Sequence, residues 1–324
     1  MENQLKKLMN DAIQMINKYN NIYICSHVQP DGDNIGSTLA LAMAIKKLKK
    51  NVSIIKVDDI PSDYIFLPHI DMFEEQEYND SVDLFISLDS SDLIRLGAGK
   101  KFALKAKNII NIDHHITNEN FGDINIVSPS SGSTGEIVYR FIKDMKVDID
   151  KDMATCLYTA ISTDTGRFMY SNTTYETHLI ASELLKIGID INNININLYQ
   201  SRTIERTRLF LEALNNLELI SENRIALVAV TQDMLQNCNA KMEDTEGIVS
   251  FIRNIDSIEV ACMLKEMSKE EVKVSLRSKK HVDVSKISIK FGGGGHAKAA
   301  GCTLYENIET AKDMLLNEIS LSFR

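Results

Sequence analysis

Histidines and aspartates gather in four short segments of this chain, at spacings that suit the binding of metal ions. In chain order the segments read HVQPDGD, SLDSSD, NIDHH and STDTGRF. Their candidate residues are His27, Asp31, Asp33, Asp89, Asp113, His114, His115 and Asp164. If the fold brings these carboxylates together they repel one another, and divalent cations relieve that repulsion. Mixed carboxylate and imidazole ligands favour Mn²⁺, with Mg²⁺, Co²⁺ or Fe²⁺ as alternatives, over Ca²⁺ or structural zinc.

The number of candidate ligands exceeds what one ion needs. A carboxylate shared by two ions would hold them about 3.5–4 Å apart, and such a pair readies a water for in-line attack at phosphorus. Each segment alone has a simpler explanation, such as a solvated loop at 27–33 or a helix N-cap at Asp89. The conjunction of the four segments is what predicts a site for two divalent metal ions.

The elements that must position these residues read as buried strands of a parallel sheet. Apolar runs at 21–26, 51–57, 81–88 and 107–112 alternate with a helical pattern at 35–50. This alternation is typical of βα units. The first three metal-binding segments each follow one of these runs. Because ligands bind outside the carboxyl ends of strands in open α/β sheets, we expect the site at that edge.

The rest of the chain predicts a second, smaller domain. Residues 131–220 are mostly helical in pattern, with Asp164 ending one helix and Gly188 stopping another. After Asn223 closely spaced strands suggest a meander-like sheet. The expected fold class is α/β: an N-terminal, mainly parallel sheet flanked by helices (1–200), a helical linker (201–222) and a C-terminal α/β domain (223–324). The active site would lie in the cleft between the two domains.

Composition limits the classes of partner and location. A net charge of −9 disfavours wrapping of long nucleic acid, which needs many basic contacts to phosphates. Five cysteines without a C-x-x-C pair disfavour structural zinc and disulfides, and suit a reducing compartment. No apolar run is long enough for a membrane span or a signal peptide. We therefore expect a cytoplasmic protein without membrane contact.

A glycine-rich segment, FGGGGHAKAAG, is the second candidate site. Glycines at 293–295 let backbone N–H groups approach a phosphate, and His296 would precede the N-terminus of a helix, which favours anions. A flexible loop is the alternative. Arg277, at the end of an expected strand, and Arg95, near Asp89, are further candidates for substrate contacts. Exposed arginines without a role are the alternative there.

Together these segments resemble the four motifs of the DHH phosphoesterases, and GGGGHAKAAG resembles the signature of the C-terminal domain found in one branch of that family. The pattern is similar to the stand-alone bacterial nanoRNase and pAp phosphatase type. The resemblance implies one metal ion on His27, Asp31 and Asp89. It implies a second on Asp33, Asp89, His114 and Asp164, so that Asp89 bridges. A homodimer is a further implication.

The resemblance also assigns roles to the other residues. His115 would reach the substrate phosphate, and it is one candidate for the acid that protonates the leaving oxygen; a metal-bound water is the other. Asp113 would orient its neighbours. The substrate would be bound by His115, Arg95, Arg277, Gly293, Gly294, Gly295 and His296, and the catalytic set would be His115, Asp113 and Asp89.

The leading hypothesis is a metal-dependent phosphohydrolase that degrades very short oligoribonucleotides to mononucleotides and converts pAp to AMP. Its partners would be short oligonucleotides and nucleoside bisphosphates. A phosphodiesterase for linear dinucleotides such as pApA is the enzymatic alternative, because it would use the same catalytic residues. An inorganic pyrophosphatase is a weaker one, because those enzymes carry a different C-terminal domain. A non-catalytic nucleotide- or RNA-binding module is the alternative from another class.

Overall fold

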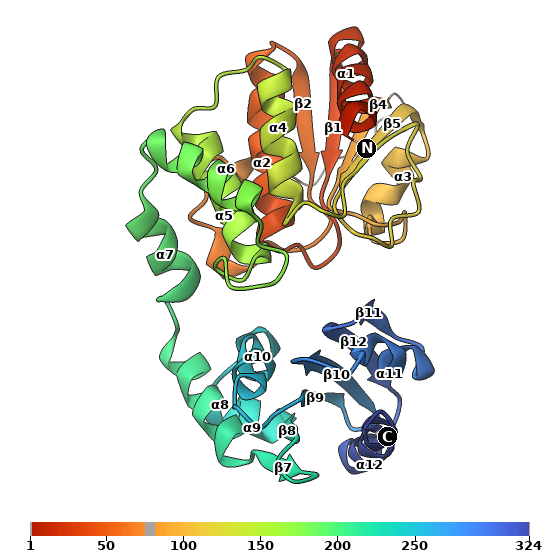
Figure 1. Ribbon diagram of the computed structural model, residues 1–324, viewed down its shortest axis with the longest axis vertical. Coiled ribbons are helices and arrows are strands. Elements are labelled where there is room, and N and C mark those ends of the chain that lie inside the picture. Colours follow the sequence, from red (N-terminus) through yellow and green to blue (C-terminus); the bar gives the residue numbers. More distant parts are fainter. Residues whose placement is uncertain (1, 75–81, 324) are drawn as a thin grey trace. The chain divides into compact units, whose positions relative to one another are not determined.

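The computed structural model describes residues 2–74 and 82–323, and the contacts divide the chain into two units, Met1–Ser201 and Arg202–Arg324. The strand expected at 81–88 begins at residue 81, which lies outside the described residues. Each unit has its own sheet and its own hydrophobic core (Figure 1). The chain therefore has the two α/β domains that its sequence predicts.

The first unit is built on a six-stranded sheet of order β3-β2-β1-β4-β5-β6, in which all neighbouring strands are parallel. The strands are β1 (Asn21–Cys25), β2 (Asn51–Ile55), β3 (Phe73–Glu74), β4 (Val82–Leu88), β5 (Ala106–Asp113) and β6 (Ile124–Val127). The expected parallel sheet is confirmed, with β3 and β6 as additional edge strands. The strand order reverses direction between β1 and β4, which makes their carboxyl ends the topological switch point of the sheet.

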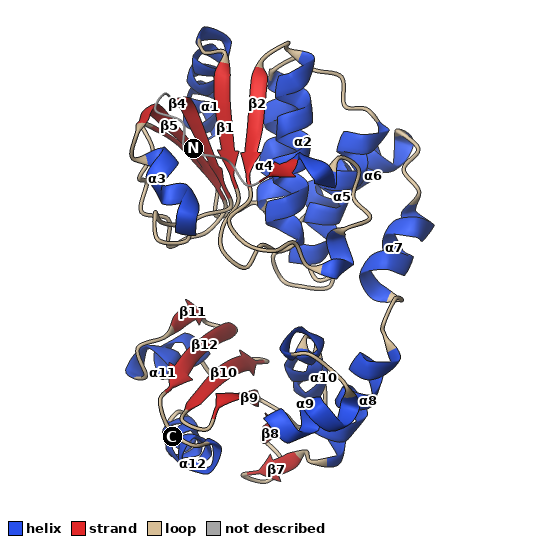
Figure 2. Ribbon diagram, turned by 180° about the vertical axis from the view of Figure 1, so that it is seen from behind, coloured by secondary structure: helices blue, strands red, loops and turns tan. Residues whose placement is uncertain are grey.

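Helices cover both faces of this sheet (Figures 1 and 2). They are α1 (Glu2–Lys18), α2 (Gly32–Lys47), α3 (Lys100–Ala103), α4 (Thr134–Asp144), α5 (Lys151–Asp164), α6 (Tyr175–Lys186) and α7 (Ile191–Tyr199), with short 3-10 turns at Ser62–Tyr64, Ile70–Met72 and Gly97–Gly99. The large core packs α1, α2, α4 and α5 against one face, and α3 covers the other. The helix expected at 35–50 starts earlier, at Gly32, because the Asp31 side chain caps it by accepting from the N–H of Asn34.

Helices α2 and α5 pack unusually closely, and this contact fixes two parts of the candidate site relative to each other. A Cβ added at Gly36 of α2 would lie 2.3 Å from the carbonyl oxygen of Cys156 in α5. At Gly32 it would lie 2.5 Å from the Thr163 hydroxyl. Because α2 begins with two candidate ligands and α5 ends with Asp164, these glycines set the distance between them.

Gly36→Ala should therefore destabilise the first unit and weaken metal binding. The obstacle is a backbone atom, which cannot rotate away, so we expect a loss of about 1–3 kcal/mol and a melting temperature lower by about 2–6 °C. Calorimetry measures the melting temperature, and metal titration measures affinity. Gly294→Ala is the matched control, because its added Cβ has nothing within 4 Å. Equal melting temperatures for Gly36→Ala and wild type would contradict the close-packing argument.

The second unit holds another six-stranded sheet, of order β11-β12-β10-β9-β8-β7. Its elements are α8 (Ile204–Asn215), β7 (Glu218–Ile220), β8 (Ile225–Val230), α9 (Gln232–Cys238), a 3-10 turn (Met242–Thr245), α10 (Ile248–Arg253), β9 (Val260–Ser268), β10 (Glu271–Ser278), α11 (Val284–Lys290), β11 (Gly294–His296), β12 (Ala299–Leu304) and α12 (Ile308–Leu321). The expected meander is only partly right, because β8 and β9 are parallel and α9 and α10 connect them.

The segment expected to link the domains, 201–222, lies in the second unit from Arg202 onward. Helix α8 buries Leu209 and Ala213 in a core cluster with β8 and β9. Strand β7 pairs with β8 in the antiparallel direction. The boundary thus falls between Ser201 and Arg202, directly after α7.

The glycine-rich segment forms a β-hairpin, and the helix expected after it is absent from residues 292–304. Strand β11 pairs with β12 in the antiparallel direction (Figure 2). Close backbone approach explains the small residues: a Cβ at Gly293 would lie 2.2 Å from the carbonyl oxygen of Gly301, and Gly295 has a φ of 137°. The glycines thus permit the two strands to pack closely. The sequence pattern alone could not distinguish such a hairpin from the start of a helix.

Candidate metal centre

Two side chains meet at the switch point of the first sheet. Strands β1 and β4 are paired so that Cys25 lies opposite Ser87, and this register continued by two residues places His27 opposite Asp89. Both residues are almost fully buried. Their closest approach, from the Nε2 atom of His27 to the Oδ2 atom of Asp89, is 3.4 Å.

His27, Asp31 and Asp89 form one group whose potential ligand atoms lie within 4.8 Å of one another. The Nδ1 atom of His27 lies 2.8 Å from the carbonyl oxygen of Val28, and donation to it leaves the lone pair of the ring on Nε2. Within the described part of the chain, this buried Nε2 has no hydrogen-bond partner. A buried nitrogen lone pair that faces two carboxylates is what a metal ligand requires.

Asp33, His114 and Asp164 form a second group of the same kind. The Nε2 atom of His114 lies 3.9 Å from Asp33 and 3.5 Å from Asp164. The Nδ1 atom of His114 lies 3.3 Å from the carbonyl oxygen of Ser131, so the ring presents its other nitrogen to the carboxylates. Asp33 itself accepts the N–H groups of Thr134 and Gly135, at the start of α4.

Asp89 connects the two groups. Its Oδ2 faces His27, and its Oδ1 lies 3.7 Å from the Nε2 atom of His114. The Thr134 hydroxyl donates to Oδ1 at 2.9 Å, and the backbone of Asp89 is left-handed, with a φ of 57°. Asp and Asn adopt this conformation more readily than other non-glycine residues. The carboxylate is therefore held in a position where one oxygen can serve each group.

In the metal-free chain, the pKa values of the aspartates in this cluster are shifted from their usual range. Burial raises the pKa of Asp33 well above its usual range, and the nearby Asp89 and Asp164 carboxylates raise it further. Burial also raises the pKa of Asp164 to about 7. For Asp89, burial is outweighed by the surrounding histidines, which hold its pKa below the usual range. Without metal ions, the cluster therefore holds protons at the positions where divalent cations would bind. Its mixture of carboxylate and imidazole donors suits hard or borderline cations.

Metal removal should destabilise the protein, and more at high pH. In the metal-free folded state the pKa of Asp164 is about 7, against about 3.9 in the unfolded chain, and the pKa of His115 is about 9, against about 6.5. The metal-free folded state therefore binds more protons than the unfolded state between about pH 4 and 9. Stability then falls as pH rises through that window. We expect EDTA to lower the melting temperature by about 5 °C or more at pH 8 and less at pH 6, as measured by calorimetry.

Adding Mn²⁺ back should restore the melting temperature and flatten its pH profile, because the bound cations replace the protons. A melting temperature at pH 8 that EDTA leaves unchanged would contradict a metal centre at this cluster.

His115 lies beside the two groups and is positioned by Asp113. The Nδ1 atom of His115 lies 2.7 Å from Oδ1 of Asp113, and Asn118 donates to the other oxygen of this fully buried carboxylate at 2.5 Å. Burial by itself would lower the pKa of His115, but the contact with Asp113 and the charge of Asp89 raise it to about 9. His115 is also grouped with Asp89 and His114 as a third set of three potential ligands.

The predicted substrate-binding residues fall into two sets. Arg95 lies in the first unit, where its Nη2 atom is 3.2 Å from the Nδ1 atom of His27, so it contacts the back of a predicted ligand. Arg277, Gly293, Gly294, Gly295 and His296 all lie in the second unit, on β10 or in the glycine hairpin. Their role toward a substrate stays a prediction.

Sequence reasoning missed the polar residues that hold the candidate ligands in place. Thr134 supports Asp89, the Ser131 carbonyl faces His114, and Asn118 supports Asp113. Asn172 donates to the backbone carbonyls of Gly132 and Asp164, and thereby joins the two loops that end at the second group. One sequence signal was the STGE start of a helix at 133–136, which indicates a helix cap but does not identify the residue that it contacts.

Among the described residues, no helix combines the length and apolar character needed to cross a bilayer.

The chain matches the DHH family, N-terminal domain, over residues 21–161 and the DHHA1 domain over residues 226–321. A relative from Thermus thermophilus, named bifunctional oligoribonuclease and PAP phosphatase NrnA, is 36% identical over 87% of this chain and 84% of its own. The protein of that name from Bacillus subtilis is 27% identical over 91% and 93%. A crystal structure of an exopolyphosphatase-related protein from Bacteroides fragilis matches with a TM-score of 0.91 and 30% identity, over 97% of this chain and 96% of that one.

Proposed function

Because this chain belongs to the DHH family of phosphoesterases, we propose that it cleaves very short oligoribonucleotides to mononucleotides and removes the 3′-phosphate of pAp. The observation that carries the proposal is the pair of ligand groups joined through Asp89. Two relatives that match most of the chain are named for the same pair of activities.

We propose that His27, Asp31 and Asp89 hold one metal ion, and that Asp33, Asp89, His114 and Asp164 hold the other. When bound, the ions supply positive charge that polarises the phosphate and lowers the pKa of a water. We propose Mn²⁺ as the preferred ion, because the donor set mixes carboxylates with imidazoles. Activity after reconstitution with Mn²⁺, Mg²⁺ or Co²⁺ measures that preference.

Neighbouring residues of the chain position the groups that take part in the reaction. We propose that Thr134 holds Asp89 by hydrogen bonding, so that its two oxygens face the two ligand groups. Asp113 keeps His115 protonated and fixes its ring. A protonated imidazole beside the ligands can donate a hydrogen bond to a non-bridging phosphate oxygen or a proton to the leaving oxygen.

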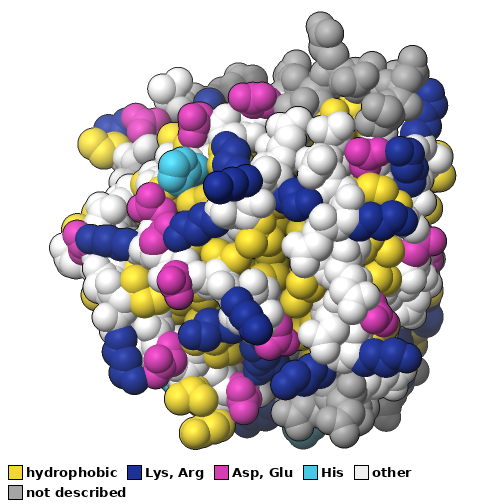
Figure 3. All heavy atoms as spheres, turned by 90° about the horizontal axis from the view of Figure 1, so that it is seen from above, with side chains coloured by type: hydrophobic (Ala, Val, Ile, Leu, Met, Phe, Trp, Pro, Cys, Tyr) yellow, Lys and Arg dark blue, Asp and Glu magenta, His cyan; other side chains and the backbone are white. Residues whose placement is uncertain are grey.

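The net negative charge of the chain and the mixed charges on one of its faces argue against a long nucleic acid as the substrate. The net charge is −9, and among the described residues on the face in Figure 3 basic side chains are interspersed with acidic ones. That face offers no continuous basic stripe within the described chain, which long nucleic acid would require. A nucleotide or a short oligonucleotide needs only local positive charge.

The function is tested by hydrolysis of pAp, pApA, pyrophosphate and oligoribonucleotides of graded length, with Mn²⁺ present. We expect turnover of pAp and of the shortest oligonucleotides, with rates that fall as length increases. Turnover of pApA alone would favour the linear-dinucleotide phosphodiesterase, and orthophosphate from pyrophosphate alone would favour a pyrophosphatase. Binding without turnover of any substrate would favour a nucleotide-binding module.

His296→Ala should selectively weaken the binding of nucleotide substrates, if the glycine hairpin holds the part of the substrate that lies away from the scissile bond. We expect KM for pAp to rise about tenfold, the equivalent of about one charge-assisted hydrogen bond, and hydrolysis of bis(p-nitrophenyl) phosphate to change little. His281→Ala, another histidine of the second unit, is the control. Equal losses on both substrates would argue against a distal binding role for His296.

A further inference from the structure

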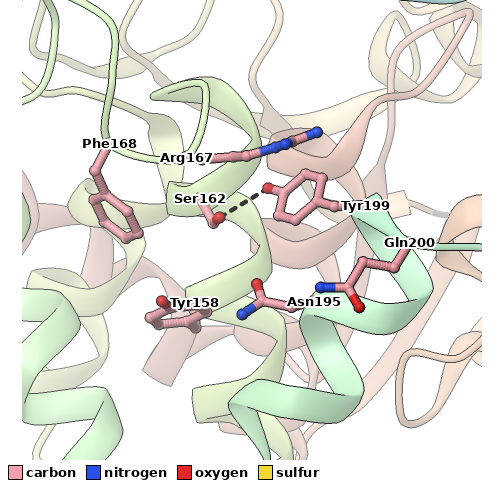
Figure 4. A pocket seen from close by; sticks show the side chains of 7 residues that line it. All are labelled: Tyr158, Ser162, Arg167, Phe168, Asn195, Tyr199 and Gln200. Carbon is pink, nitrogen blue, oxygen red and sulfur yellow. Dashed lines mark hydrogen bonds between the residues drawn. The ribbon is translucent and has the colours of Figure 1, made fainter.

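The first unit contains a cavity of about 360 Å³ between α5, the turn that follows it and α7 (Figure 4). Three aromatic rings line it: Tyr158 from α5, Phe168 from the turn and Tyr199 from the end of α7. The volume is within the range of pockets that bind small molecules, and aromatic walls suit a flat ring.

Two side-chain amides also line the cavity. Figure 4 shows Asn195 on α7 and Gln200, the residue directly after α7, extending toward the hollow. Neither amide makes a hydrogen bond to any residue in the described ranges; Asn195 is half-buried and Gln200 is exposed. By contrast, the amides of Asn34 and Asn172 near the ligand groups each donate to a carbonyl. The two lining amides therefore offer donors and acceptors to whatever enters the cavity.

The wall nearest the ligand groups is a strained turn. Gly166, Arg167 and Phe168 are successive residues with φ values of 56°, 62° and 63°. Non-glycine residues in this conformation cost energy and concentrate at functional sites. The Arg167 N–H donates to the Ser162 carbonyl at 2.7 Å, which ties the turn back to α5.

The turn also places a cation at the rim. The guanidinium of Arg167 stacks over the Tyr199 ring at 4.0 Å, and the Tyr199 hydroxyl lies 2.8 Å from that of Ser162. These contacts order Tyr199 and one side of the cavity (Figure 4). No carboxylate is among the lining residues that the structure describes, so the cavity suits a neutral ring attached to an anionic group.

We propose that this cavity binds a nucleobase. Tyr158 and Arg167 supply stacking surfaces, Phe168 closes the wall while itself stacked on His178, and the amides of Asn195 and Gln200 supply the paired donor and acceptor that read a base edge. The inference rests on the proposed function, because nucleotide substrates are what would bring a base here. Ser162, which lines the cavity, lies two residues before Asp164 on α5, about 3 Å along the helix axis, and the two side chains leave the helix on opposite faces. The base belongs either to the substrate or to a second nucleotide.

The test uses the full-length protein stripped of metal with EDTA, so that phosphate binding at the ligand groups does not contribute. Adenosine, with ribose as the control ligand, is titrated by calorimetry and by saturation-transfer NMR. We expect adenosine but not ribose to bind, and the double variant Asn195→Ala/Gln200→Ala to bind about tenfold more weakly. Asn193→Ala, on the same helix but outside this cavity, is the matched control.

Kinetics with Mn²⁺ then identify the source of the base. If the base belongs to the substrate, the double variant has a higher KM for pApA than wild type and the same kcat. For a pApA analogue that lacks the bound base, the KM values of the double variant and wild type become equal. If adenosine binds but KM is unchanged, the ligand is a separate nucleotide and the site stands. Absence of adenosine binding, or equal binding to the double variant, overturns the proposal. Lack of hydrolysis by wild type would overturn only the proposed function, since adenosine binding is measured without catalysis.

Discussion

Asp89→Asn should abolish hydrolysis, with kcat lowered about 10³-fold or more, because this one carboxylate is proposed to bind both metal ions. The two oxygens of Asp89 face different histidines, His27 at 3.4 Å and His114 at 3.7 Å. An amide keeps the shape, tolerates the left-handed backbone, and retains an oxygen to accept from the Thr134 hydroxyl. It removes the negative charge that two cations would share. Atomic emission on the dialysed protein should then find less than one bound ion per chain.

The control for this variant is Asp83→Asn, which removes a carboxylate from the same strand, β4, but pairs with Lys107 away from the ligand groups. It should keep wild-type metal content and activity. In EDTA, Asp89→Asn and wild type should melt within a few degrees of each other, which separates loss of chemistry from loss of folding. Near-normal turnover by Asp89→Asn with two bound ions would overturn the assignment of Asp89 as the shared ligand.

The edge of the first sheet at which the candidate ligands gather was predictable because it depends on strand ends. Buried parallel strands are continuous apolar runs, and polar residues directly after them must lie at one edge. His27, Asp89 and Asp113 could therefore be placed from sequence alone. The left-handed backbone at Asp89 and the reversal of strand order between β1 and β4 are tertiary features that no local pattern indicates.

The supporting residues could not be predicted, because their partners are distant in sequence. Thr134 lies 45 residues from Asp89, and Asp33 meets the start of α4 about a hundred residues later. The same limit explains the errors in the second unit. Four glycines before a histidine are compatible with a helix start or a hairpin, and only the contact of Gly293 with β12 decides between them. The homodimer, the cytoplasmic location and the roles of Arg95 and Arg277 stay predictions.

His115→Gln should lower kcat about 10²- to 10³-fold while both metal ions stay bound, because His115 is proposed to contact the phosphate and not to hold a metal. Glutamine retains a hydrogen-bond donor but carries no transferable proton. Metal content measured on the variant distinguishes this role from ligation, since His115 also lies in a group of three potential ligands with Asp89 and His114. Loss of a metal ion with the activity would show that His115 is a ligand.

The protonation state of His115 gives a sharper test. In the metal-free chain, Asp113 and Asp89 raise its pKa to about 9, and bound cations would lower that value by repulsion. If the protonated ring acts in catalysis, kcat should fall on the alkaline side with an apparent pKa at or below about 9. Asp113→Asn removes the carboxylate whose contact raises the pKa, so it should move this limb to lower pH by about one unit. An alkaline limb that stays in place in Asp113→Asn would mean that the titrating group is not His115, and a metal-bound water would then be the better candidate for the acid.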